Sequence, residues 1–162
     1  MPHDWSAVTA EYFGQHCAET PRFEGLQVQK LAPDLWRYIE AIEATRPDLI
    51  IECGTAHGGS AHFFAGVQRM FGIDGRVVTI DIEGARAGTR TKHKQITYIT
   101  ADSGSDEAYR AVAPLRAGAE RRMVVLDSDH TAAHVTRELA LWSDAVTPGC
   151  YLVVEDTCVN GH

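Results

Sequence analysis

The side chains best suited to chemistry gather in two short segments, and each segment directly follows an apolar run. Residues 126–130 read Leu-Asp-Ser-Asp-His, and residues 153–156 read Val-Val-Glu-Asp. Both segments would lie at the carboxyl end of a strand, and in an open parallel sheet ligands bind beyond these ends. We therefore expect an imidazole and four carboxylates to share one edge of the sheet: His130, Asp127, Asp129, Glu155 and Asp156.

A divalent metal ion is the simplest explanation for so many acids at one edge, because packed carboxylates repel one another unless a cation or a proton intervenes. Oxygen ligands suit Mg²⁺ or Ca²⁺, and Mg²⁺ keeps positions open for a substrate. The alternative is that the acids cap helices, a role for which Asp129 or Thr131 is well suited. His130 and His134 have a spacing that can hold zinc, but no H-E-x-x-H pattern surrounds them. We favour the divalent metal.

A glycine-rich segment, Glu-Cys-Gly-Thr-Ala-His-Gly-Gly-Ser at residues 52–60, follows the first apolar run. Glycines allow the backbone to pass close to a ligand before a helix begins, although such a turn can also simply join a strand to a helix. The G-x-x-x-G-G spacing differs from the G-x-G-x-x-G of dinucleotide-binding proteins. The carboxylate of Glu52 would repel a pyrophosphate but could accept a hydrogen bond from an ammonium, which favours S-adenosylmethionine.

Polar residues also end the second and third apolar runs. Asp81 has the position at which an acid typically binds the hydroxyls of a ribose, although it could instead cap the following loop. Asp102 and Ser103 come after the third run and could hold the edge of an adenine.

The elements that must position these residues are five short apolar runs separated by helical stretches. Near-continuous apolar runs are typical of strands buried on both faces, as in a parallel sheet. Strand and helix alternate, which predicts an α/β fold with a doubly wound sheet. The expected strands are residues 48–53, 76–81, 96–100, 123–127 and 150–156, and the expected helices are residues 59–71, 106–116 and 131–145.

We predict one structural domain from the length of 162 residues, with two parts. Residues 1–47 are expected to form an N-terminal helical segment, because Leu35, Ile39 and Ile42 recur at helical spacing and Pro47 ends the pattern. Residues 48–162 are expected to form the cofactor-binding part.

Composition excludes several classes of protein. A content of 44% hydrophobic and 23% charged residues excludes a disordered chain. Apolar runs fall far short of the ~20 residues that span a bilayer, so we expect no integral membrane protein, and the N-terminus has no secretory signal pattern. A net charge of −7 disfavours nucleic acid as a partner. The four cysteines form no C-x-x-C pair, which favours a reducing cytoplasm. They are Cys17, Cys53, Cys150 and Cys158.

On these motifs the sequence resembles the cephalosporin hydroxylase / rhamnosyl O-methyltransferase family of class I, S-adenosylmethionine-dependent enzymes. The matching segments, residues 51–60, 78–82, 126–131 and 147–157, occur in the expected order. The resemblance implies a Rossmann-like, mostly parallel methyltransferase sheet. It also implies which residues bind the cofactor. The methionine part would contact Glu52, Gly54, Gly58 and Ser60, the ribose would contact Asp81, and the adenine would contact Asp102 and Ser103.

The resemblance further implies a Mg²⁺-dependent O-methyltransferase that acts on a hydroxyl of a small molecule, such as a sugar or a natural-product scaffold. Glu155 and Asp156 match metal ligands on the last strand, and the third acid is Asp127 or Asp129, of which we prefer Asp127. His130 has the place of the general base.

Family members usually continue after the fifth strand with a helix and an antiparallel strand pair, whereas this sequence ends at His162. We therefore expect a sheet without that pair, an exposed edge and association into a homo-oligomer. Two other functions remain open: a non-catalytic, cofactor-binding partner subunit, and a nucleotide-dependent oxidoreductase, which the glycine spacing disfavours.

Overall fold

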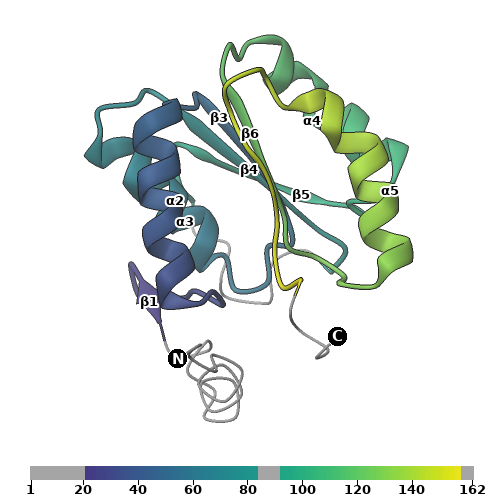
Figure 1. Ribbon diagram of the computed structural model, residues 1–162, viewed down its shortest axis with the longest axis horizontal. Coiled ribbons are helices and arrows are strands. Elements are labelled where there is room, and N and C mark those ends of the chain that lie inside the picture. The colour runs from purple at the N-terminus through teal and green to yellow at the C-terminus, as the bar shows by residue number, and fades with distance from the viewer. Residues whose placement is uncertain (1–20, 84–91, 158–162) are drawn as a thin grey trace, which may run out of the picture.

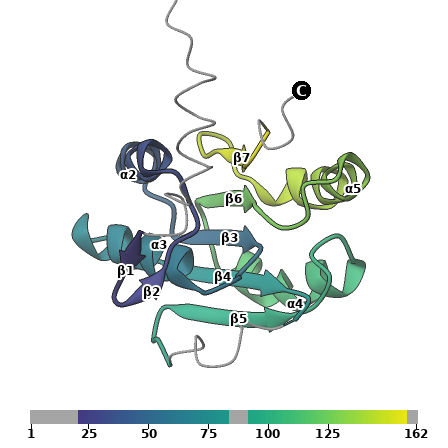
Figure 2. The same cartoon turned by 90° about the horizontal axis from the view of Figure 1, so that it is seen from below.

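The computed structural model describes residues 21–83 and 92–157 and has a five-stranded parallel sheet at its centre. The strand order is β5-β4-β3-β6-β7, and each neighbouring pair is parallel. Figure 2 shows these strands side by side. The expected α/β class and doubly wound sheet are confirmed. The strands are β3 (Leu49–Cys53), β4 (Arg76–Asp81), β5 (Ile96–Thr100), β6 (Arg122–Leu126) and β7 (Leu152–Val154).

Helices cover both faces of the sheet, with α2 and α3 on one face and α4 and α5 on the other (Figures 1 and 2). Three of them match the expected helical stretches closely, although α5 ends at Trp142 and continues as a 3₁₀ turn, η2 (Ser143–Ala145). The helices are α2 (Ala32–Thr45), α3 (Gly59–Met70), α4 (Asp106–Ala117) and α5 (Ala132–Trp142).

Strand β3 shows why the apolar runs lack a polar face. Ile50 packs into the core beneath α2 and α3, whereas Leu49 and Ile51 pack into the core beneath α4 and α5. All three are at most 1% exposed. Because successive strand residues point to opposite faces, a strand covered on both sides needs apolar residues at nearly every position.

Within the expected N-terminal helical segment, residues 1–47, the helical spacing is confirmed over Ala32–Thr45, whereas the described residues before it, 21–31, are not helical. A hairpin of β1 (Arg22–Phe23) and β2 (Leu26–Gln27) precedes α2. Its turn residues, Glu24 and Gly25, both have positive φ angles, of 50° and 82°, as the two-residue turns that join hairpin strands require. This turn reverses the chain before a helix can start. Residues 1–20 lie outside the described residues, and the division into two parts at residue 47 stays a prediction.

Three further predictions concern the sheet edge, the cysteines and membrane-spanning helices. Strand β7 is an edge of the described sheet, and self-association through it stays a prediction. Cys53 and Cys150 are free, whereas Cys17 and Cys158 lie outside the described residues. No helix within residues 21–83 and 92–157 is long and apolar enough to cross a membrane.

Gly54 fixes how closely the loop after β3 approaches β6. Its φ is +98°, and a Cβ atom there would lie 1.9 Å from the backbone oxygen of Asp127. We expect Gly54→Ala to lower the free energy of unfolding by about 3 kcal/mol or more, from left-handed strain and overpacking together. Gly25→Ala is the matched control, since Gly25 has φ +82° but no atom within 4 Å, and it should cost only about 1–2 kcal/mol. Urea denaturation measures both, and equal losses would contradict the close approach.

Candidate cofactor and metal site

Backbone hydrogen bonds connect the glycine loop after β3 with the neighbouring strand ends, including the end of β6, where Asp127 lies. Gly54 and Gly58 have positive φ angles, and Gly58 is the N-cap of α3. The amide of Asp127 donates to the carbonyl of Cys53 at 2.8 Å, and the amide of Gly54 donates to the carbonyl of Ile80 at 2.8 Å. The ends of three neighbouring strands are thus tied together by backbone hydrogen bonds.

A cavity of about 210 Å³ opens between this glycine loop and the acids. Gly54 and Ser60 line it from the loop, and Asp127, His130 and Asp156 line it from the ends of β6 and β7. The structure therefore places five of the expected site residues around one space. Gly58 is part of the loop but does not line this cavity.

Three of the expected residues converge on a point suitable for a cation, and we call Asp127, His130 and Asp156 the rim cluster. The Nε2 atom of His130 lies 3.4 Å from an Asp156 oxygen and 4.0 Å from an Asp127 oxygen. One ligand atom from each residue lies within 4.8 Å of the others. The rim cluster can therefore offer two carboxylates and one imidazole to the same ion.

Glu155 lies beside the rim cluster but is engaged elsewhere. The ammonium of Lys30 donates to Glu155 at 3.1 Å and to Asp127 at 2.6 Å, and the hydroxyl of Tyr38 also donates to Glu155. All of these contacts link the start of α2 and the residues just before it to the ends of β6 and β7. Sequence reasoning missed Lys30 and Tyr38, although Tyr38 continues the apolar stripe of α2 one turn before Ile42.

Lys30 supplies part of the positive charge that the packed acids need. Its side chain is 1% exposed. Burial alone would lower the pKa of Lys30, but the carboxylates of Asp127 and Glu155 outweigh burial and hold this pKa above its usual value. Burial raises the pKa of Asp127 to about 6, and Lys30 opposes that rise. The lysine therefore stays charged in this site and favours the ionised form of Asp127.

Asp129 does not join the rim cluster. Its carboxylate is exposed and accepts a hydrogen bond of 2.9 Å from the amide of Thr131, which holds the pKa of Asp129 below its usual value. The hydroxyl of Thr131 in turn accepts from the amide of His134 as the N-cap of α5. The capping alternative is thus confirmed for Thr131, and the geometry favours Asp127 as the third acid.

Glu52 is completely buried and does not line the cavity. Its exposure is 0%, and neither carboxylate oxygen has a partner in hydrogen-bonding geometry within the described residues. Burial raises the pKa of Glu52 to about 7, and the nearby Lys30 ammonium and the hydroxyls of Ser60 and Thr79 act in the opposite direction. Burying a charged acceptor without a partner is costly, so the site favours the protonated form of Glu52.

Asp81 holds the glycine loop in place. One of its oxygens accepts hydrogen bonds from the amides of Thr55 at 3.0 Å and Ala56 at 2.9 Å. The other accepts from the amide of Glu83 at 3.1 Å. The alternative of a loop-capping acid is therefore confirmed, and a role in binding ribose stays a prediction.

Ser103 faces inward rather than toward the cavity. It is 4% exposed, and its hydroxyl donates to Glu138 at 2.5 Å and lies 3.2 Å from the ring of His134. Asp102 accepts from the amide of Gly104 at 2.8 Å. Neither residue lines the 210 Å³ cavity, and their contact with adenine stays a prediction.

The raised pKa of Glu52 predicts a pH-dependent loss of stability. A folded-state pKa of about 7 against an ordinary value of 4.5 means that folding disfavours the charged form. The penalty is absent below pH 4.5 and complete above pH 7. We therefore expect Glu52→Gln to be more stable than the wild type at pH 8, by up to about 3 kcal/mol at about 1.4 kcal/mol per pKa unit.

This stability difference should shrink as the pH falls from 8 to 5, as measured by urea denaturation at both values. Glu43→Gln is the control, because Glu43 is exposed on α2. The difference in stability between this variant and the wild type should be the same at both pH values. A Glu52→Gln difference that stays constant between pH 5 and 8 would contradict the assignment.

Several solved structures share this fold. The structure of CmcI described as bound to Mg and SAM is 18% identical, with a TM-score of 0.68 over 87% of this chain and 59% of that one. The apo structure of CmcI has a TM-score of 0.67 at 21% identity, with the same coverage. The MycE methyltransferase from the mycinamycin biosynthetic pathway has a TM-score of 0.58 at 22% identity, over 96% of this chain and 40% of that one. These similarities establish that the chain shares the fold of CmcI and MycE.

Sequence comparison defines the family more narrowly. The family described as "Rhamnosyl O-methyltransferase/CmcI" matches residues 15–162. Rhamnosyl O-methyltransferases of Mycobacterium tuberculosis (strain H37Rv) and Mycobacterium leprae are each 32% identical over 99% of this chain. The chain spans 64% of the first relative and 68% of the second. It belongs to the rhamnosyl O-methyltransferase/CmcI family, as the sequence motifs suggested.

Proposed function

We propose that this chain forms the cofactor- and metal-binding part of an S-adenosylmethionine-dependent O-methyltransferase, whose acceptor is a hydroxyl of a small molecule such as a sugar. One observation carries the proposal: the rim cluster faces the same cavity as the glycine loop. The relatives support it, because curated family members are named rhamnosyl O-methyltransferases and a MycE structure is described with Mg, SAH and mycinamycin VI.

The donor atoms fit a hard divalent cation. Asp127 and Asp156 offer carboxylate oxygens, the ligands that Mg²⁺ prefers, and Glu155 would become a third donor if Lys30 released it. When bound, Mg²⁺ would lower the pKa of an acceptor hydroxyl. The proposed ligands are Asp127, Glu155 and Asp156, without Asp129.

The residues around the loop also fit a zwitterionic nucleoside. A contact between Glu52 and the ammonium of the cofactor would require this fully buried carboxylate to become accessible. Gly54 and Ser60 line the cavity from the loop, and Gly58 begins the helix that follows the loop. Asp81, Asp102 and Ser103 would hold the ribose and adenine from the ends of β4 and β5.

His130 is the proposed general base. Its side chain is 31% exposed and lies 3.4 Å from Asp156, so it can reach both solvent and the cavity. Imidazoles exchange protons near neutral pH. His130 would accept the proton of the acceptor hydroxyl, and Asp156 would orient the ring and stabilise its charged form. Positioning would supply most of the remaining rate enhancement.

The proposed cofactor can be tested by calorimetry with S-adenosylmethionine and NAD⁺ in parallel. We expect heat of binding with S-adenosylmethionine alone, because Glu52 and the glycine spacing do not suit a pyrophosphate. Binding of NAD⁺ instead would favour the oxidoreductase. Binding of S-adenosylmethionine without methyl transfer to any of a panel of hydroxylated acceptors would favour the partner subunit.

The metal ligands can be separated by a matched pair of variants. Asp127→Asn should weaken Mg²⁺ binding at least ~10-fold, because it removes a charged oxygen from the rim cluster, and it should leave cofactor binding mostly intact. Asp129→Asn should leave Mg²⁺ binding unchanged, because the Asp129 carboxylate is exposed and only accepts a hydrogen bond from the amide of Thr131, before α5. Calorimetry with Mg²⁺ measures both effects. Activity of the wild type that survives excess chelator would overturn the metal assignment.

The role of His130 predicts a loss of rate without a loss of binding. His130→Ala should bind S-adenosylmethionine and Mg²⁺ normally but transfer methyl groups roughly 10²–10⁴ times more slowly. The deficit should shrink at high pH, where solvent can take the proton. Formation of S-adenosylhomocysteine, with methyl rhamnoside and mycinamycin VI as trial acceptors, gives the rate. An unchanged rate would exclude His130 as the base.

A further inference from the structure

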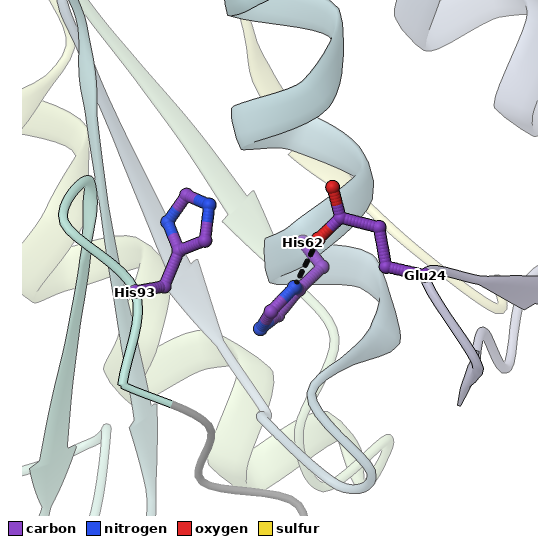
Figure 3. Close-up of side chains that lie close together, drawn as sticks. All are labelled: Glu24, His62 and His93. Atoms are coloured by element: carbon purple, nitrogen blue, oxygen red, sulfur yellow. Dashed lines mark hydrogen bonds and ion pairs between the residues drawn. The ribbon is translucent and has the colours of Figure 1, made fainter.

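A second group of metal-binding side chains lies outside the proposed active site, and we call it the hairpin cluster: Glu24, His62 and His93. Glu24 comes from the turn between β1 and β2, His62 from α3, and His93 from the segment just before β5 (Figure 3). The Nδ1 atom of His62 lies 2.7 Å from an oxygen of Glu24. The rings of His62 and His93 are 5.0 Å apart between centroids. The hairpin cluster shares no residue with the rim cluster.

Two imidazoles and one carboxylate form a donor set that suits Zn²⁺, which binds nitrogen and oxygen ligands at 2.0–2.2 Å and can accept three protein ligands and one water. One ligand atom from each residue of the hairpin cluster lies within 4.8 Å of the others. Tetrahedral zinc ligands are about 3.3 Å apart at these bond lengths, so the ligand atoms would have to close by about 1.5 Å at most. The buried ring of His62 provides a fixed point, and the partly exposed His93 and Glu24 can rotate toward it.

A cation already occupies the hairpin cluster. The guanidinium of Arg69 donates to Glu24 at 2.7 Å and lies 2.9 Å from the Nε2 atom of His93. Its side chain is 41% exposed, so it can withdraw into solvent. An arginine that contacts two of three metal-binding side chains is placed where an incoming dication would replace it.

The pKa shifts of His93 and Glu24 agree with the geometry of the hairpin cluster. Burial lowers the pKa of His93, and the neighbouring His62 and Arg69 lower it further. The hydrogen bond from His62, together with Arg69, holds the pKa of Glu24 below its usual value. A neutral imidazole and an ionised carboxylate are the forms that bind a metal.

We propose that Glu24, His62 and His93 form a Zn²⁺-binding site in which the metal displaces Arg69. The site is structural: it joins the β1–β2 hairpin to α3 and to the start of β5. Gln27, at the end of the hairpin, packs closely on the start of α3, because a Cβ atom placed at Gly59 would lie 2.1 Å from the Gln27 carbonyl oxygen. Three residues later the chain reaches Lys30, which contacts Asp127 of the rim cluster. Bound zinc would therefore stabilise the segment from the β1–β2 hairpin to Lys30, which supports the proposed active site.

The test is a titration of the untagged, full chain with Zn²⁺ against a chromophoric zinc chelator. The protein carries His130→Ala and the buffer contains excess Mg²⁺, so that the rim cluster contributes no imidazole. We expect one equivalent of tightly bound Zn²⁺. Glu24→Gln and His93→Ala should each weaken binding at least ~10-fold, since each removes a ligand. Arg69→Met should strengthen binding, because it removes the competing cation.

The opposite effects on Zn²⁺ affinity, weaker for Glu24→Gln and His93→Ala but stronger for Arg69→Met, distinguish a metal site from a structural hydrogen-bond network. All three substituted side chains are partly or largely exposed, so the variants should fold, which far-ultraviolet circular dichroism checks. Co²⁺ in place of Zn²⁺ should give tetrahedral d–d absorption bands that His93→Ala abolishes. The proposal is overturned if no equivalent of Zn²⁺ binds, if His93→Ala leaves binding unchanged, or if Arg69→Met weakens it.

Discussion

The buried ammonium of Lys30 is the interaction on which the proposed active site depends. It neutralises two carboxylates that arrive from different strands, Asp127 after β6 and Glu155 after β7. Without a cation, these largely buried acids would repel one another. Because Lys30 follows the hairpin and precedes α2, the ion pairs also fix the N-terminal segment to the carboxyl edge of the sheet. One side chain thus sets both the charge balance and the position of the surrounding elements.

This arrangement gives the acids two different environments. Glu155 is held by Lys30 and Tyr38 on the side of α2, whereas Asp156 turns toward His130. The change of direction follows from the backbone, because Asp156 has a positive φ of 55°. Two adjacent acids in the sequence therefore need not act as equal ligands. A divalent ion that recruited Glu155 would have to compete with a lysine that is already well paired.

The sequence predicts the strands and helices well because burial on both faces leaves a strong local signal. Ile50 and Val125 illustrate this, since each has to be apolar to fit beneath a helix. The exceptions have long-range causes. Nothing near Lys30 in the sequence indicates that it meets Asp127, and nothing near Ser103 indicates that Glu138 draws it inward. The hairpin was missed because its signal is only a Glu-Gly pair at residues 24 and 25, within an apolar pattern that resembles a helix.

The close approach of Gly54 to residue 127 has a consequence for protein engineering. The loop that would contact the cofactor and the strand end that would contact the metal touch through backbone atoms, with no side chain to act as a spacer. A designer who enlarged residue 54 to admit a different cofactor analogue would push on the main chain that carries Asp127. Selectivity for the two ligands therefore cannot be tuned separately at this point. Libraries for altered methyl donors would need to vary the loop and the end of β6 together.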